Sequence, residues 1–339
     1  MTGKFLLPDM GFCGRISNLM LFHNFRFNHY RFHFSPLENL RMPKYNKGNT
    51  IRGGFGTILR RIACVHQNIE CDNCDLRFSC PYTRIFNPFI PPEAERLRKN
   101  LNIQRPFVVK PPLETKTSYG PYEPLIFEII LVGDAQEYIP YIIVTFKELA
   151  EHGFGLNRAQ CRLSQIETVK IDGTTTSIYE SKNNTVISSQ SSITWTDVTA
   201  AYKDIQKSRE LCITFLTPTT LKANGRLSFV PQFHVLLKRL RDRLNALSYF
   251  YCGETIDIDF KALGEQAEKI KETFIRSTWE ERSRSTRRRT KHDLSGFVGT
   301  VTYRGNFKPF MPFLLLGQYV HVGKGTVFGN GWYKVEGVG

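Results

Sequence analysis

Aromatic and polar residues alternate over residues 24–34, as in a half-buried β-strand. The aromatic positions change from odd to even numbers near His29, which predicts a β-bulge there. The other elements expected in the first half are a helix at residues 50–66, strands at 106–110 and 125–132, a helix at 135–151 and a strand near 161–166. Their order is β-α-β-β-α-β, the ferredoxin-like pattern.

The second half of the chain repeats this order. Its expected elements are a strand at residues 210–216, a helix at 233–250, a basic hairpin at 276–291, a strand at 297–303, a helix at 309–320 and a strand at 332–335. Each half also has a glycine-rich turn between its second helix and its last strand, which favours a duplication. The pattern therefore predicts an α+β protein with two tandem ferredoxin-like domains.

Length and composition fit this division, since 339 residues are enough for two domains. We predict an N-terminal domain at residues 1–170 and a C-terminal domain at residues 209–339. Between them, residues 171–208 begin with a stretch rich in Ser, Thr and Asn and are expected to form a polar insertion or linker.

The chain is strongly basic, with 46 Lys and Arg against 31 Asp and Glu and a net charge of +15. It also contains 26 Phe and 14 Tyr, so positive charge and stacking surfaces can coexist. This combination suits nucleic acid as a partner, although a large aromatic core would use the same residues. No run of 18 apolar residues and no signal-peptide pattern is present, so we expect a cytoplasmic protein with no membrane partner.

Four cysteines cluster in the first half with spacings of six, two and five residues, namely Cys64, Cys71, Cys74 and Cys80. A C-x-x-C pair with two flanking cysteines is typical of a metal site, which we expect to form a knuckle inserted in the first domain. Four thiolates suit a structural zinc ion, which we favour, and equally an iron–sulfur cluster.

Residues 321–331 form the glycine-rich segment, which contains Gly323, Gly325, Gly329 and Gly331. Such glycines permit close approach of another backbone, and with Lys324 among them we expect a phosphate chain as ligand. The spacing excludes a P-loop and a dinucleotide-binding fingerprint. An alternative is a turn that only lets a helix pack on a sheet.

The expected basic hairpin holds six arginines and one lysine against two glutamates. A charge run of this kind is either a solvated face or an arm that contacts RNA phosphates. Its candidate RNA contacts are Arg284, Arg287, Arg288 and Arg289.

Several stretches resemble the CRISPR repeat-RNA-processing endoribonucleases of the RAMP superfamily. They are TIRGGFG at residues 50–56, GFG at 153–155, FLTPTTLK at 215–222 and above all the block at 296–333. The resemblance implies two ferredoxin-like domains, cleavage of precursor CRISPR RNA without a catalytic metal, and, for some members, association with other Cas subunits of an effector complex. It adds Arg52 to the candidate RNA contacts.

Cleavage of this kind needs a base for a 2′-OH, an acid for the leaving oxygen and a cation for the phosphorane. Histidine suits both proton transfers because its pKa lies near 7. We rank His321 first, with Lys324 stabilising charge, and His29 second. A non-catalytic RNA-binding subunit and an iron–sulfur protein of redox or DNA metabolism remain alternatives.

Overall fold

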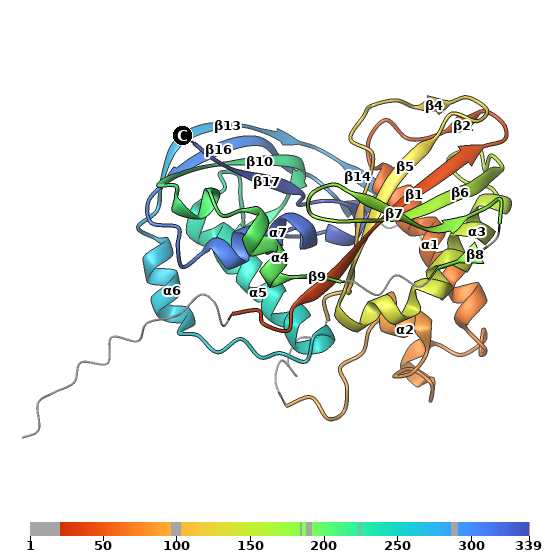
Figure 1. Ribbon diagram of the computed structural model, residues 1–339, viewed down its shortest axis with the longest axis horizontal. Helices are drawn as coiled ribbons and strands as arrows, with labels where there is room; N and C mark the ends of the chain where they lie inside the picture. The colour runs from red at the N-terminus through yellow and green to blue at the C-terminus, as the bar shows by residue number, and fades with distance from the viewer. Residues whose placement is uncertain are drawn as a thin grey trace, which may run out of the picture.

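Two β-sheets stand side by side in the computed structural model, one from each half of the chain (Figure 1). The structure describes residues 21–95, 103–183, 185–187, 192–223, 225–285 and 291–338. Within this part of the chain, no helix is long and apolar enough to cross a membrane.

The first sheet is built from the elements predicted for the first half. They are β1 (Arg26–Pro36), α1 (Lys47–Ala63), β3 (Phe107–Lys110), β5 (Leu125–Val132), α3 (Ile139–Glu151) and β6 (Cys161–Val169). The strand order is β3-β5-β1-β6, and all three pairings are antiparallel. The short helix α2 (Pro81–Ile85) follows α1, and the 3-10 turn η3 (Gly133–Tyr138) leads into α3.

The second sheet has the same topology. Its elements are β10 (Glu210–Thr219), α5 (Phe233–Tyr251), β13 (Lys271–Glu280), β16 (Gly296–Arg304), α7 (Met311–Val320) and β17 (Tyr333–Gly337). The order β13-β16-β10-β17 again places the first strand of the half between its third and fourth strands. Each half thus contains the β-α-β-β-α-β succession expected from the sequence.

The remaining described elements lie in connections. They are β2 (Leu40–Arg41), η2 (Cys71–Asn73), β4 (Ser118–Tyr119), η4 (Ile205–Lys207), β11 (Leu221–Ala223), β12 (Arg226–Ser228), α6 (Phe260–Ala267), β14 (Ser283–Ser285), β15 (Lys291–Asp293) and η5 (Thr326–Phe328).

The predicted polar insertion, residues 171–208, adds structure to both halves. Its strands β7 (Thr175–Glu180) and β8 (Thr185–Val186) extend the first sheet beyond β6, and β9 (Ile193–Thr194) pairs with β1. The helix α4 (Trp195–Ala201) then packs against α7 of the other half. Its start is fixed by a capping box between Thr194 and Asp197.

The change from odd-numbered to even-numbered aromatic positions in β1 is not caused by the predicted bulge at His29. Phe27 is buried in the core that the two halves share, whereas Phe32 and Phe34 are buried in the core of the first half. Both faces of this strand therefore bury aromatic residues, at different points along its length. The register shift that does occur lies between His33 and Phe34, against β6.

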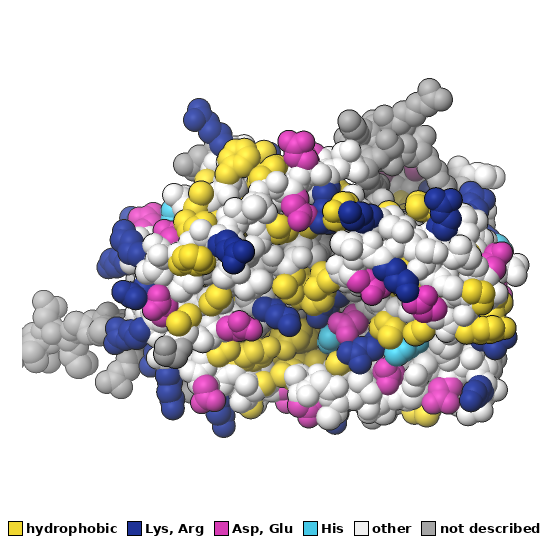
Figure 2. Space-filling model, turned by 90° about the horizontal axis from the view of Figure 1, so that it is seen from above, with side chains coloured by type: hydrophobic (Ala, Val, Ile, Leu, Met, Phe, Trp, Pro, Cys, Tyr) yellow, Lys and Arg dark blue, Asp and Glu magenta, His cyan; other side chains and the backbone are white. Residues whose placement is uncertain are grey.

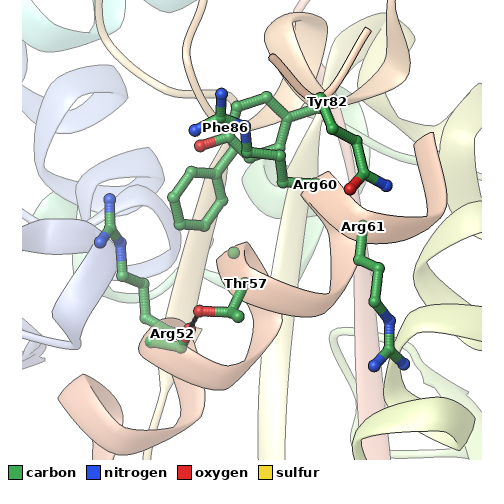
Figure 3. A pocket seen from close by; sticks show the side chains of 9 residues that line it. Arg52, Thr57, Arg60, Arg61, Tyr82 and Phe86 are labelled. Carbon is green, nitrogen blue, oxygen red and sulfur yellow. Dashed lines mark hydrogen bonds between the residues drawn. The ribbon is translucent and has the colours of Figure 1, made fainter. Parts of the chain in front are cut away.

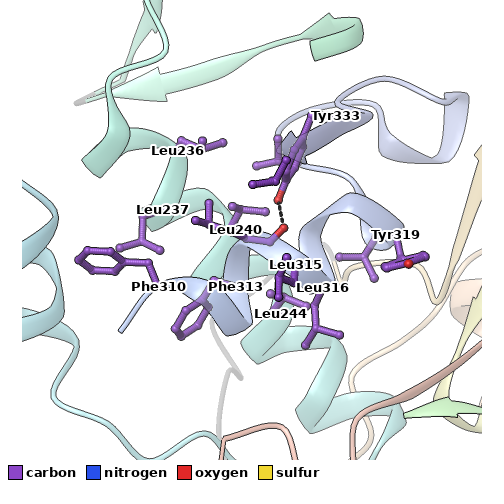
Figure 4. Packing of buried hydrophobic residues seen from close by; sticks show 14 of the residues in the cluster. Leu236, Leu237, Leu240, Leu244, Phe310, Phe313, Leu315, Leu316, Tyr319 and Tyr333 are labelled. Atoms are coloured by element: carbon purple, nitrogen blue, oxygen red, sulfur yellow. Dashed lines mark hydrogen bonds between the residues drawn. The ribbon is translucent and has the colours of Figure 1, made fainter. Parts of the chain in front are cut away.

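The core of the second half is centred on α7, whose ten residues are all buried. Leucines of α5 pack against it, and Tyr333 of β17 donates a hydrogen bond of 2.7 Å to the carbonyl oxygen of Leu314 (Figure 4). Gly317 is required here, because a Cβ would overlap the Tyr333 hydroxyl. The sequence of α7 thus places the glycine-rich segment that follows it.

A buried arginine ties the halves together. Arg243 of α5 donates from Nε to the carbonyl oxygen of Val320 at 2.7 Å and from Nη1 to Gln104 Oε1 at 2.6 Å. Tyr251 donates to the carbonyl oxygen of Gln104 at 2.9 Å. Burial lowers the pKa of Arg243 to about 9. The end of α7 and the segment before β3 are therefore held by one helix.

Candidate nucleic-acid interface

The glycine-rich segment lies at the junction of the two halves. A Cβ at Gly48, at the start of α1, would overlap the carbonyl oxygen of Phe328. A Cβ at Gly329 would overlap Pro111, which directly follows β3. Glycines at these points therefore allow two backbones from different halves to meet. This close approach is what the sequence pattern predicted.

The amide groups of the segment are only partly available to a ligand. The N–H of Gly329 donates to the carbonyl oxygen of Thr326, and that of Gly331 donates to Pro218, both at 3.0 Å. Both glycines are buried, whereas Gly323 and Gly325 are half-exposed. Within the segment, these two half-exposed glycines are the better candidates for phosphate contact, and Gly329 and Gly331 shape the junction.

His321 ends α7 and is completely buried, with a relative exposure of 0%. Its Nδ1 lies 3.2 Å from the carbonyl oxygen of Asn330, its Nε2 has no hydrogen-bond partner, and its ring stacks on Trp332 at 5.8 Å. Burial, reinforced by the charges of Lys110 and Arg243, lowers its pKa well below the ordinary value. In this arrangement no phosphate reaches the ring, so the geometry does not favour our first-ranked catalytic candidate.

Lys324 does not converge on His321 as we expected. Its side chain is exposed and lies beside Lys222, in a cavity of about 220 Å³ that Arg239 also lines. Partial burial, followed by the charge of Lys222, lowers the pKa of Lys324. Asp242 also lines the cavity and pairs with Arg239 at 3.6 Å. Lys222 and Lys324 repel each other until an anion is bound, so the cavity suits a phosphate.

His29 belongs to a charged network on the face of the first sheet opposite α1 and α3. Its Nε2 lies 2.7 Å from Glu128 Oε2, and Arg31 and Lys110 bind the same carboxylate at 3.0 and 3.4 Å. Burial lowers the pKa of His29, and the hydrogen bond to Glu128 opposes this shift. Burial would raise the pKa of Glu128, but its bonds to His29 and Arg31 and the charge of Lys110 lower it well below its ordinary value.

This network extends to the glycine-rich segment. Lys110 Nζ lies 4.5 Å from the centroid of the Trp332 ring, which stacks on His321. The two histidine candidates therefore lie at opposite ends of one chain of contacts. His33, next along β1, makes a separate pair of 2.7 Å with Glu167. Figure 2 shows basic side chains spread over one face of the molecule and interspersed with acidic ones.

A second polar group lies just before α1 and was missed by sequence reasoning. Tyr45 is 48% exposed, and its ring lies 5.3 Å from Lys44 Nζ and 4.8 Å from the Arg282 guanidinium. Lys47, at the first position of α1, donates to the carbonyl oxygen of Glu114, and burial lowers its pKa. A lysine next to a tyrosine, Lys44 and Tyr45, could have indicated an RNA contact in the sequence. Only the contact of α1 with the glycine-rich segment shows that they lie near the proposed interface.

The predicted arginines fall into two groups. Arg52 lies over the rings of Phe86 at 4.2 Å and Phe328 at 4.9 Å, so it connects α1 to the glycine-rich segment. Arg284 is in β14, which pairs with β15 as a hairpin. The other three arginines lie outside the described residues: Arg287, Arg288 and Arg289.

The four clustered cysteines come together without forming a coordination site. Cys71 is close enough to Cys64, Cys74 and Cys80 for their charges to raise its pKa, although burial is the larger cause. Among the described residues, however, no group of three or more His, Cys, Asp or Glu side chains is arranged to hold a metal ion. The thiol donor set suits zinc, but the knuckle itself is not shown, and zinc or an iron–sulfur cluster remains a prediction.

In comparisons with known proteins, two family models match different parts of the chain. A family model described as an N-terminal domain matches residues 25–191, and one described as CRISPR-associated endoribonuclease Cas6 matches residues 213–333. An uncharacterized protein of Archaeoglobus fulgidus is 25% identical over 314 residues, which cover 88% of this chain and 95% of that protein.

Solved Cas6 structures are similar over most of the chain. The Thermus thermophilus Cas6 has a TM-score of 0.54 at 15% identity, and a Cas6 product complex has 0.55 at 14%; each covers 92% of this chain and 99% of the other. A partial Cas6-RT-Cas1--Cas2 complex matches with a TM-score of 0.55 at 14% identity, over 93% of this chain and 46% of that one. Residues 213–333 therefore match the family of CRISPR-associated Cas6 endoribonucleases, and the chain as a whole has the Cas6 fold.

Proposed function

We propose that this protein binds and cuts the repeat RNA of precursor CRISPR transcripts, using two tandem ferredoxin-like domains. One observation carries the proposal: the glycine-rich segment, within the part that matches the Cas6 model, joins α1 of the other half and lies beside cations from both halves. A repeat RNA seated there would contact Lys222, Lys324 and Arg52.

The chemistry uses the RNA itself as nucleophile. A base removes the proton of a 2′-OH, the 2′-oxygen forms a bond to the adjacent phosphorus, and the bond from phosphorus to the 5′-oxygen breaks. An acid protonates the leaving 5′-oxygen, so the products are a 2′,3′-cyclic phosphate and a 5′-hydroxyl. Lys or Arg stabilises the charge that develops on the phosphorane. We propose that no metal ion takes part.

Among the candidates, His29 now ranks above His321. Its lowered pKa keeps the imidazole neutral near pH 7, and the Glu128 carboxylate favours the tautomer that carries the proton on Nε2. Nδ1 is then the basic atom. Tyr45, between Lys44 and Arg282, is a further proton-transfer candidate at the start of α1.

The test is cleavage of radiolabelled repeat RNA by the pure protein in EDTA, with the product ends analysed for a cyclic phosphate. We expect cleavage to continue in EDTA. Single-turnover rates and RNA affinities of His29→Ala, Tyr45→Phe and His321→Phe then locate the proton-transfer group. A His29→Ala protein that binds and cuts at the normal rate removes His29 from the mechanism.

One observation favours a second candidate function, a non-catalytic RNA-binding subunit. Both leading histidines are buried, His29 with 7% exposure and His321 with none. A subunit of this kind would bind repeat RNA and leave it intact under all conditions, so the same assay separates the two functions. Because a chain of similar fold is part of a Cas6-RT-Cas1--Cas2 complex, we also propose other Cas subunits as partners.

A further inference from the structure

A cavity of about 380 Å³ lies between α1 and the end of α2 and shares no lining residue with the cavity beside Lys324. Figure 3 shows it close by. We call it the arginine pocket; its principal lining residues are Arg52, Gly53, Arg60, Arg61, Tyr82 and Phe86.

The sequence of α1 builds the floor of this pocket from small residues. A Cβ at Gly56 would overlap the ring of Phe86, so this glycine seats the aromatic wall against the helix. A Cβ at Gly53 would meet nothing within 4 Å, so open space remains above it. The rings of Tyr82 and Phe86 stack at 5.5 Å and 22°, and α2 returns them to α1 after the cysteine-containing loop.

The charge of the pocket is positive, because three arginines and no acidic residue line it. Arg61 pairs with Glu148 at 3.0 Å, in a position exposed to solvent. Within the described part of the chain, Arg60 forms no salt bridge with an acidic side chain; its guanidinium lies 6.0 Å from the Tyr82 ring centroid and next to the thiols of Cys64 and Cys71. An arginine beside an aromatic wall is a common setting for a phosphate and its attached base.

We propose that the arginine pocket holds a nucleotide of single-stranded RNA that flanks the repeat, with its phosphate on Arg60 and its base against Tyr82. Arg52 supports this path, since its guanidinium contacts both Phe86 in the pocket and Phe328 in the glycine-rich segment. A strand leaving the glycine-rich segment past Arg52 enters the pocket directly. This inference rests on the proposed RNA-binding function and adds the arginine pocket to the surface that contacts RNA.

The test uses repeat RNAs with a single-stranded flank at the 5′ end, at the 3′ end or at neither end. Gly53→Leu fills the open space, and leucine is a better helix former than glycine, so the fold is retained. Arg60→Ala removes the phosphate contact. The matched controls are on α6: Gly264→Leu, at a helical glycine that also has nothing within 4 Å, and Lys261→Ala, which removes an exposed positive charge.

For the wild type we expect one flanked RNA to bind about tenfold more tightly than the bare repeat, in the range of one stacked base with its phosphate. Gly53→Leu and Arg60→Ala abolish this gain, and both α6 variants keep it. For the flanked RNA, the slope of log affinity against log salt concentration becomes shallower by about 0.7 in Arg60→Ala.

Two results overturn the inference: neither flank strengthens wild-type binding, or both pocket variants retain the full gain. A pocket that serves an acidic protein partner instead gives the second result. If the wild type fails to bind even the bare repeat, the proposed function fails as well, so the two failures are distinct.

Discussion

Both halves have a glycine-containing turn after the second helix of their β-α-β-β-α-β succession, but the two turns contact different parts of the molecule. In the first half, a Cβ at Gly153 would overlap the carbonyl oxygen of Arg158, and Phe154 donates to the carbonyl oxygen of Ala159 at 2.8 Å. That turn also meets β2, since the N–H of Leu156 donates to the carbonyl oxygen of Arg41 at 2.8 Å, so its contacts stay within the first half. His152 remains exposed and pairs with Glu148 at 3.5 Å. The glycine-rich segment of the second half reaches across to α1 and β3 instead.

This difference shows that glycine content alone does not define a ligand site. Gly153 and Gly331 both have positive φ, at 100° and 75°, and both are required by a nearby carbonyl oxygen. The two turns differ in what they contact: the first meets β2 of its own half, and the second meets α1 and Pro111 of the other half and lies beside cations from both halves. An interface between domains offers more surface to a polymeric ligand than a local turn does.

The largest expected effect comes from Gly331→Ala. The added Cβ overlaps the carbonyl oxygen of Val322, and the residue keeps φ near 75°, so we expect a loss of more than about 4 kcal/mol and failure to bind RNA. Thermal unfolding is the measurement. Gly173→Ala is the control, since its φ is 84° but nothing lies within 4 Å, and its cost is about 1 kcal/mol. Equal losses would show that backbone strain, not the junction, dominates.

The next comparison is between the two histidines that end the second helices. His321→Ala leaves a cavity beside Trp332, and we expect it to lower the free energy of unfolding by roughly 3 kcal/mol. His152→Ala removes an exposed side chain and should cost less than about 1 kcal/mol. Urea denaturation of both proteins checks the contrast. Similar small losses would contradict a packing role for His321.

The burial of His321 also predicts how the stability of the protein depends on pH. Because the folded pKa of His321 lies below its unfolded value of about 6.5, the unfolded chain binds more protons at acidic pH, and stability falls as pH decreases below 6.5. The slope for one such group is at most about 1.4 kcal/mol per pH unit. His29 contributes with the same sign. We expect His321→Phe to reduce the slope between pH 6.5 and 5, measured by urea denaturation at each pH. An unchanged slope would contradict this role of His321.

The smallest expected effect concerns a feature found in the first half alone, the cysteine cluster. If the four thiols bind zinc, elemental analysis of the wild type gives one zinc per chain, and Cys74→Ser loses it. We expect Cys74→Ser to make residues 64–80 sensitive to limited proteolysis while the second half stays protected. Cys212→Ser, a scattered cysteine, is the control. A wild type without zinc or iron would eliminate the metal site.

Much of the fold follows from periodicity, because each half buries one face of a sheet under its helices. The helix at α7 and the strands β5 and β16 lie within a few residues of their predicted positions. The shift in aromatic positions along β1 was misinterpreted as a bulge, because the odd-numbered and even-numbered aromatic residues pack in two different cores. The alternation rule assumes that a strand buries one face in one core, so it does not describe a strand whose two faces are buried in different cores.

The site was less predictable than the fold. Sequence reasoning found the glycine-rich segment, but it ranked His321 first because this histidine follows a helix beside the glycines, three residues from Lys324. The structure buries this ring against Trp332, a contact that depends on the turn of the whole segment. Tyr45 and Arg282 were missed because they are far apart in sequence and meet only in the folded chain.

The contact between Gly48 and Phe328 has a consequence for the order in which the protein matures on the ribosome. The first domain emerges early, but the backbone that completes the start of α1 is made about 280 residues later, on the order of 15 to 60 s at ordinary elongation rates. Until then a nascent chain lacks the backbone that completes this part of the proposed RNA-binding surface.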